Sequence, residues 1–549
     1  MSGDAAQSAV VRKLARGSLI SRLIRPGRKP LRLVAVPRDH VQGDRRRGDA
    51  LLSGNFTWGS ETLPLADLDF AAVGTGTPLA DQLQGFSWLR DLAAAASREK
   101  GARLAEAIAG RWLLAHGTRV DPAWRPDLWG ERILFWTAYA PYLLSSSDAG
   151  YRSALLNTLA RGARFLEANA DRAPAGLRRV TAWAGVVAAS LLVQSEVSRV
   201  ARAEAGLGRA LGSAQFDDGG LVSRTPYEQA LLVDRLALLR SAYFAAKHTP
   251  PEGLEAASAA ALSALHGILL GDGAMSSWQG GNSGEPERLT AIVEGCGLRA
   301  RPLRQPRGWG FHRLSALGTV VVMDAAPPPP PKAAPTGCAS TLAFELSDGP
   351  QRLIVNCGGP APLGGEMAAE LATALRTTAA HSTVTVADTN STAILADGAL
   401  GKGVADVDVE RTEDNDSSRI AASHDGYQRG FGLLHRRTLT LGNDGKELTG
   451  LDELLPKGRK RSKDGTAFAI RFHLAAGIEP TVTADGMGAI LRSPGAPPWN
   501  FRSRGAAIGV EESLMVDGRG RPRRTMQLVI NGEAAADGAQ VQWQLRRSS

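Results

Sequence analysis

One histidine, His381, stands among small residues in the stretch TTAAHSTVTVADTNST (377–392). Val384 and Val386 alternate with threonines directly after it, and this alternation is typical of a β-strand. An imidazole at the mouth of a strand can bind a metal ion, transfer a proton near neutral pH, or bond to the backbone. Which of the three uses applies depends on the elements around it.

A second polar group lies in DDGGLVSRTPYEQALLVDRL (217–236). Thr225 followed by Pro226 is typical of a helix N-cap and first helical residue, and Glu228 completes a capping box. A chemical alternative is a pair of carboxylates for glycoside hydrolysis by inversion. Its acids would come from Asp217, Asp218, Glu228 and Asp234, although the first two are also ordinary turn residues.

The loop GDGAMSSWQGGNSGEP (271–286) embeds Trp278, Gln279 and Asn282 among glycines. An aromatic face with amide groups is suited to binding a sugar ring, so these three residues are candidate substrate ligands. The alternative is an ordinary loop between domains.

The elements that must position these residues change type along the chain. From about residue 62 to 270, apolar residues recur at helical spacing between Gly and Pro breaks. After about residue 306, short β-rich runs alternate with Gly, Asp, Asn and Pro, which indicates an antiparallel sandwich. We therefore expect an α+β multidomain protein, with a basic tail (1–48), a helical domain (49–305) and a β-sandwich domain (306–549), and with a rigid proline-rich connector at 326–337.

The positive charge of the chain is confined to its start. Residues 1–48 carry 12 Lys and Arg against 3 Asp and Glu, whereas residues 49–549 carry 52 of each sign. A balanced body argues against a nucleic-acid partner. Residues 8–32 are basic and amphipathic, so peripheral membrane contact is one use of this tail, and docking on the body or a disordered arm are the others.

Six stretches resemble the bacterial heparinase II/III-like family and span both halves. They are FSWLRDL (86–92), DDGGLVSRTP (217–226), AFELSDGPQRLIVNCGG (343–359), RTTAAHSTVTVADTNS (376–391), SHDGYQRGFGLLHRRTLTL (423–441) and RFHL (471–474). The resemblance implies an (α/α) toroid-like helical domain followed by an antiparallel β-sandwich. It also implies a polysaccharide lyase acting on an acidic, uronate-containing polysaccharide.

Such a lyase removes the C5 proton of a uronate and expels the 4-linked sugar by β-elimination, without a redox cofactor. The site must stabilise the uronate carboxylate, and a Tyr or His must transfer protons. The resemblance therefore implies catalytic roles for His381 and Tyr227. Arg224 would hold the carboxylate through a bidentate pair, and His312 would join the substrate contacts.

The sequence departs from the family pattern at Ala379, Leu221, Thr225 and Phe311, where relatives commonly have polar or hydroxyl-bearing side chains. A catalytically decayed glycan-binding protein of the same fold is therefore the alternative function, and an inverting glycosidase is a third.

The resemblance also suggests a small structural zinc site. Its candidate ligands are His381 and His424, with His435 and His473 as companions. Cys296, Cys338 and Cys357 have no CxxC spacing and are expected to be buried small residues. The family implies the cell envelope or periplasm, whereas the arginine-broken N-terminus favours a cytoplasmic or membrane-peripheral location. The sequence does not specify an oligomeric state.

Overall fold

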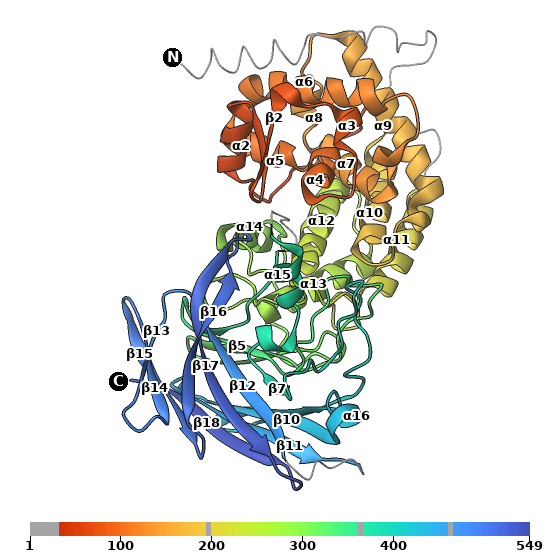
Figure 1. Ribbon diagram of the computed structural model, residues 1–549. Helices are drawn as coiled ribbons and strands as arrows, with labels where there is room; N and C mark the ends of the chain where they lie inside the picture. Colours follow the sequence, from red (N-terminus) through yellow and green to blue (C-terminus); the bar gives the residue numbers. More distant parts are fainter. Residues whose placement is uncertain (1–31, 194–198, 361–366, 459–464, 549) are drawn as a thin grey trace.

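Helices form the N-terminal part of the molecule and antiparallel sheets form its C-terminal part (Figure 1). The computed structural model describes residues 32–193, 199–360, 367–458 and 465–548. The expected order, a helical domain followed by a β-sandwich, is confirmed. Within these residues, no helix has both the length and the apolar character needed to cross a bilayer.

The helical part begins with a short strand pair that the sequence did not suggest. β1 (Asn55–Trp58) and β2 (Glu61–Pro64) form a hairpin after the first described helix. The helices are α2 (Arg45–Leu52), α3 (Phe70–Val73), α4 (Pro78–Gly85), α5 (Trp88–Ala95), α6 (Arg98–His116), α7 (Pro126–Ala138), α8 (Ala140–Leu143), α9 (Ala149–Asn169), α10 (Leu177–Leu192), α11 (Val200–Ala214), α12 (Pro226–Ala245), α13 (Glu252–Ile268) and α14 (Pro286–Gly295).

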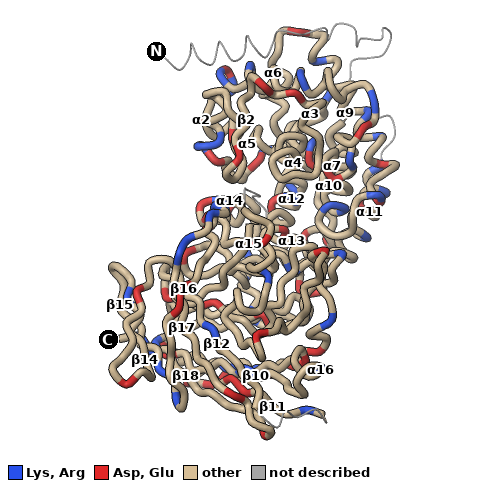
Figure 2. Tube along the Cα trace, in the orientation of Figure 1, with Lys and Arg blue, Asp and Glu red and all other residues tan. Residues whose placement is uncertain are grey.

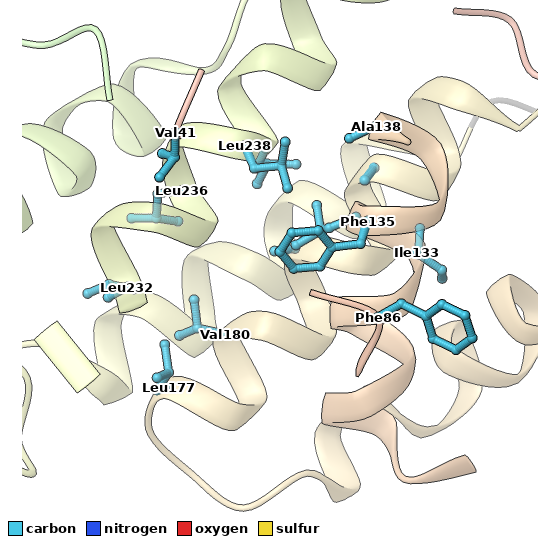
Figure 3. Packing of buried hydrophobic residues seen from close by; sticks show 14 of the residues in the cluster. Val41, Phe86, Ile133, Phe135, Ala138, Leu177, Val180, Leu232, Leu236 and Leu238 are labelled. Atoms are coloured by element: carbon cyan, nitrogen blue, oxygen red, sulfur yellow. The ribbon is translucent and has the colours of Figure 1, made fainter. Parts of the chain in front are cut away.

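Helix α10 is the centre of this part because it is apolar on nearly all sides. Helices α7, α11 and α12 pack around it. Figure 3 shows side chains of α7 (Ile133, Phe135), α10 (Val180) and α12 (Leu232, Leu236) in the shared core.

Two glycines bring α7 and α10 into backbone contact. A Cβ at Gly130 would lie 2.2 Å from the carbonyl oxygen of Thr181, and a Cβ at Gly185 would lie 2.5 Å from the Cα of Gly130. The crossing is therefore closer than any residue with a side chain would allow at these positions.

The chain upstream of α2 is bound into the helical core by a buried ionic network. Arg90 donates to Asp39 (2.6 Å) and to Asp234 of α12 (2.8 Å), and Tyr139 donates to Asp39 (2.9 Å). Burial raises the pKa of Asp234, but Arg90 and the neighbouring Arg235 more than offset it and hold that pKa below its ordinary value. Asp234 is consequently ionised and paired.

The C-terminal part consists of two sheets of eight strands. The first has the order β13–β14–β15–β18–β11–β10–β9–β8, and the second has the order β16–β17–β12–β6–β5–β4–β3, with β7 also paired to β12. The strands are β3 (Phe311–Ala316), β4 (Thr319–Asp324), β5 (Phe344–Asp348), β6 (Gln351–Val355), β7 (Val384–Val386), β8 (Val407–Glu413), β9 (Ser417–His424), β10 (Leu433–Gly442), β11 (Glu447–Pro456), β12 (Thr466–Leu474), β13 (Glu479–Val482), β14 (Gly488–Ser493), β15 (Ala496–Arg504), β16 (Ile508–Val516), β17 (Pro522–Ala534) and β18 (Ala539–Arg547). Two short helices interrupt them, α15 (Ala369–Ala374) and α16 (Gln428–Phe431).

Alternate side chains of these strands fill a core between the two sheets. Strand β11 alternates buried and half-buried residues along most of its length, as the period of two predicts. Trp543 of β18 lies opposite Gly450 of β11, where a Cβ would be 2.0 Å from the indole ring. The glycine therefore makes room for the tryptophan across the strand pair.

A hydrogen-bonded chain of buried side chains crosses β9, β10 and β11. The Gly426 N–H donates to His424 Nδ1 (3.0 Å), so His424 Nε2 is left to donate to His435 Nδ1 (3.3 Å). His435 Nε2 then donates to Asp452 (2.9 Å), which also accepts from Arg437 (2.8 Å). Burial lowers the pKa of both histidines, so both imidazoles are neutral and paired.

Buried polar contacts join the two parts of the molecule. Arg224, in the turn before α12, forms an ion pair with Asp324 at the end of β4, and Ser340 donates to the same carboxylate (2.7 Å). Glu345 of β5 accepts from the Ser277 N–H of the 271–286 loop (2.9 Å). The charged side chains of both signs are otherwise interspersed over both parts (Figure 2).

Candidate functional site

A cavity of about 330 Å³ lies where the helical part meets a segment of the β part. Its walls come from the end of β1, from α4, α7, α10 and α12 with the residues just before them, and from residues 333–336. This last segment is the end of the proline-rich connector between β4 and β5, where Ala333 and Ala334 both donate to the carbonyl of Pro330 (2.8 and 3.2 Å). The connector thereby forms one wall of the cavity.

The start of α12 presents Tyr227 and Glu228 to this cavity. Thr225 is the N-cap residue and Pro226 the first helical residue, as the sequence predicts. The expected capping box is wrong, because the Thr225 hydroxyl bonds to the Ser223 carbonyl (3.3 Å) and Ser223 donates to Glu228 (2.6 Å). Burial raises the pKa of Glu228, and this bond from Ser223 opposes the shift.

The Tyr227 hydroxyl is a free polar group in the cavity wall. Within the described residues no hydrogen bond to it is found, and burial raises its pKa to about 12 although Arg235 acts in the opposite direction. The phenol therefore stays protonated at neutral pH and can donate to an acceptor that enters the cavity.

The charged groups of the cavity differ in how firmly they are held. Arg125 donates to Asp81 (2.8 Å) and to Asp127 (2.7 Å), and Arg235 of α12 pairs with Glu131 of α7. Arg178 at the start of α10 is held loosely, with its side chain 53% exposed and its Nε 3.8 Å from Asp127.

Trp58 at the end of β1 adds an aromatic wall and a second free donor. Trp58 is 9% exposed, and across the part of the chain with described positions its buried Nε1–H has no hydrogen-bond partner. Gln82 of α4 accepts a bond from Ser87 through its amide oxygen, which leaves the amide N–H groups for the cavity. The guanidinium carbon of Arg47 lies over one face of the Trp58 ring, 4.7 Å from its centroid. Donors and carboxylate acceptors beside an indole suit a polyhydroxylated ring with an acidic group.

His381 is not among the residues that line this cavity. Its ring is 2% exposed, and its Nδ1 donates to the carbonyl oxygen of Thr377 (2.7 Å). Burial lowers its pKa to about 4, against the raising effect of this bond. The neighbouring His473 bonds through Nε2 to Ala379 (2.9 Å) and through Nδ1 to Ser513 (2.8 Å).

Arg224 also lies outside the cavity wall, although it precedes Tyr227 by three residues. Its guanidinium donates to the carbonyls of Trp309 (2.9 Å) and Pro327 (2.6 Å) as well as to Asp324. It also stacks on Phe311, with 4.6 Å between the guanidinium carbon and the ring centroid. The structure thus gives Arg224 protein acceptors on every side and does not bring it together with Tyr227.

The candidate sugar ligands of the 271–286 loop, Trp278, Gln279 and Asn282, are buried. Trp278 donates to Ser276 (2.6 Å) and stacks on Phe311, Gln279 accepts from the Cys338 N–H (2.9 Å), and Asn282 accepts from the Gly284 N–H (3.0 Å). His312 on β3 is also buried, and burial lowers its pKa to about 4. None of these four side chains lines the cavity.

The histidines do not assemble a zinc site within the described ranges. There, no group of three or more His, Cys, Asp and Glu is placed to hold a metal ion. His381 bonds to Thr377, whereas His424 belongs to the chain of bonds through His435 to Asp452. The two candidate ligands thus belong to separate sets of hydrogen bonds. The three cysteines are buried and free.

Sequence reasoning found Tyr227 but missed most of the other groups in this cavity. They come from four separate helices and one hairpin, and each stands in an amphipathic or turn context. They are Trp58, Asp81, Gln82, Arg125, Asp127, Glu131, Arg178 and Arg235. The signal available in the sequence was Trp58 itself, an aromatic residue next to a Gly-Ser turn.

Comparison with known proteins places the chain among polysaccharide lyase folds. Residues 299–544 match the family model "Heparinase II/III-like, C-terminal". Among solved structures, Heparinase III has a TM-score of 0.69 at 12% identity over 98% of this chain and 89% of that one. A mutant of the heparan sulfate lyase HepC from Pedobacter heparinus has a TM-score of 0.62 at 14% identity, over 100% of this chain and 89% of that one.

The chain is also similar to a curated protein along nearly its whole length. It is 28% identical over 537 residues to the FtsZ-localized protein C of Caulobacter vibrioides, covering 95% of this chain and 91% of that protein. The likeness to the lyases establishes the fold alone. The function of this chain depends on the residues of its cavity.

Proposed function

Because residues 299–544 match the C-terminal model of the heparinase II/III-like family, we propose that the cavity of this chain receives a sugar unit of an acidic polysaccharide. In this function the protein is a glycan-binding member of a lyase fold. The observation that carries the proposal is a cavity lined by Trp58 and Tyr227, whose Nε1–H and hydroxyl have no hydrogen-bond partner among the described residues, and bordered by the loosely held Arg178.

Each cavity group has a use in holding a uronate. Arg178 pairs with the sugar carboxylate, because giving up its weak interaction with Asp127 requires little free energy. Trp58 and Tyr227 donate to ring or hydroxyl oxygens, and Glu131 and Asp81 accept from hydroxyl groups. A volume of about 330 Å³ suits one sugar unit of a longer chain.

Binding without cleavage is favoured by the state of the two groups expected to move protons. A pKa of about 12 keeps Tyr227 protonated, which makes it a poor base for the weakly acidic C5 proton. His381 uses Nδ1 on the Thr377 carbonyl and lies outside the cavity wall.

The second candidate function is β-elimination with Tyr227 as the proton-transfer residue. It is favoured by the position of Arg235, which lines the same cavity and opposes the rise in the Tyr227 pKa. A bound uronate carboxylate next to Arg178 and Arg235 would have its charge partly neutralised, as elimination requires.

Calorimetric titration with uronate oligosaccharides tests the proposal. The variants Trp58→Phe and Tyr227→Phe each remove one donor, so each should weaken binding by roughly 3- to 10-fold, as loss of one hydrogen bond does. Tyr151→Phe is the matched control, because its buried hydroxyl also has no partner within the described ranges but does not line the cavity. Equal affinity of all three variants and the parent protein would refute the proposal.

The same samples separate binding from cleavage. With a lyase, the ultraviolet absorbance of an unsaturated uronyl end would rise during incubation, and Tyr227→Phe would abolish the rise. We expect no rise, and no new reducing ends, over a panel of uronate polymers. A rise that depends on Tyr227 would establish the second candidate instead.

A further inference from the structure

A second and larger cleft, of about 1,150 Å³, opens on the β part. It is lined by the β7–β8 connection (Thr389, Asn390 and residues 401–405), by residues 425–432 between β9 and β10, and by the two residues that follow β11 (Lys457, Gly458). It shares no lining residue with the cavity in the helical part. The family resemblance and the proposed function leave this cleft without a role.

The cleft is positively charged. Lys402, Arg429 and Lys457 line it and are exposed, and within the described residues none of them forms an ion pair or a side-chain hydrogen bond. The acidic residue of the lining, Asp425, is already engaged, because one of its oxygens accepts from the N–H groups of Ala405 (2.9 Å) and Asp406 (3.2 Å). Three free cations against one engaged acid favour an anionic ligand.

The walls of the cleft are fixed to the sandwich. Tyr427 donates to the Val384 carbonyl (2.7 Å), and the Lys457 N–H donates to the Gly432 carbonyl (2.7 Å). The Val404 N–H donates to the Thr392 hydroxyl (3.1 Å). A ligand therefore meets a surface that is largely formed before it binds.

The neutral groups of the lining suit sugar rather than phosphate. Phe431 is half-buried beside Tyr427, with 6.4 Å between the ring centroids, and provides an apolar face. Gln428 and Asn390 add side-chain amides, and Asn390 already accepts from the Thr378 N–H (2.9 Å), which leaves its amide N–H groups available. An aromatic face, two amides and three cations match the ring, hydroxyl and carboxylate groups of an acidic saccharide.

We infer that this cleft is a second glycan site, which binds several units of the acidic polysaccharide whose single unit enters the helical cavity. The inference rests on the proposed function for the ligand class, but its residues are independent of that cavity. Residues 459–464 (RKRSKD) lie outside the described residues and are no part of the site.

The test compares a long polyuronate with a uronate trisaccharide on the full chain. In the triple variant Lys402→Ala, Arg429→Ala and Lys457→Ala, polymer affinity should fall about tenfold, as expected for losing three exposed charge contacts. Trisaccharide affinity should change less than about twofold, because the helical cavity is intact. The difference in polymer affinity should shrink as ionic strength rises.

A control variant removes the same charge from elsewhere on the β part. Lys446, Arg492 and Arg504 are exposed and do not line the cleft, so their replacement by Ala should leave both affinities unchanged. If the cleft variant and the parent protein bound the polymer equally well, the inference would be overturned. The proposed function would still stand if the protein bound the trisaccharide and Trp58→Phe weakened that binding. Binding of inorganic polyphosphate at the cleft as tightly as polyuronate would overturn the saccharide assignment. If neither saccharide bound at all, both proposals would fall.

Discussion

At the scale of single residues, the buried histidines make the protein sensitive to acid. Burial sets the pKa of His381 to about 4, below the ordinary value of 6.5, so an unfolded chain takes up this proton at a pH where the folded chain does not. Protonation of His381 therefore does not lower the free energy of unfolding above about pH 6.5, and it lowers it progressively as the pH drops toward 4.

The variant His381→Asn keeps a donor for the Thr377 carbonyl but cannot titrate. Between pH 7 and pH 4.5 its free energy of unfolding, measured by urea denaturation, should fall by ~2 kcal/mol less than that of the parent protein. The exposed His248 gives the control, and His248→Asn should retain the parent's acid dependence. An unchanged acid dependence in His381→Asn would contradict the assignment.

The sequence could identify these residues but not their surroundings. His381 was expected at a strand mouth, and it does precede β7 by three residues. Its enclosure depends on the Thr377 carbonyl and on contacts made by β12 from about 90 residues away, for which no local pattern exists. Arg224 is similar, because its partner Asp324 is 100 residues away in the chain.

At the scale of elements, the closest packing is the crossing of α7 and α10. At a solvent-exposed position inside a helix, replacing Gly by Ala stabilises the folded protein by about 1 kcal/mol. At Gly130 the new methyl group would lie 2.2 Å from the Thr181 carbonyl oxygen, so Gly130→Ala must separate two helices of the core. We expect it to lower the free energy of unfolding by ~2 kcal/mol, measured by chemical denaturation.

Gly212 on α11 is the matched control, because a Cβ there meets nothing within 4 Å. Gly212→Ala should raise stability slightly, by ~0.5–1 kcal/mol. Stabilisation of both variants would mean that α7 and α10 are not in backbone contact.

The period of the apolar residues predicted the elements well and the cavity poorly. Helical spacing and strand alternation lie in contiguous letters, so the order of helices and sheets follows from them. Asp81, Arg125, Glu131 and Arg178 each look like part of a solvated helix face. They meet only because the helices α4, α7 and α10 converge, and this convergence is a tertiary property.

At the scale of the whole molecule, one buried ion pair joins the two parts. The side chains of Arg224 and Asp324 are 3% and 1% exposed. Arg224→Met would leave the Asp324 carboxylate buried without its partner, so we expect a loss of ~3–5 kcal/mol in the free energy of unfolding. Adding Asp324→Asn to it should recover part of the loss, because the uncompensated charge is then gone.

Arg436, whose pair with Glu410 is exposed, provides a comparison of the same chemical type. Arg436→Met should hardly move the denaturation midpoint, since exposed ion pairs contribute little. If Arg224→Met behaved like Arg436→Met, the two parts would be held together by other contacts, such as those of Glu345.

The wall made by residues 333–336 means that the cavity of the helical part exists only while the connector rests against the helices. Occupancy and assembly are then linked quantities. A sugar that touches both walls stabilises the contact between them. By thermodynamic reciprocity, any change that loosens this contact weakens binding of the sugar by the same free energy. Substitutions that loosen the contact between the connector and the helices should therefore lower the affinity for the sugar, even where the substituted residue does not touch it.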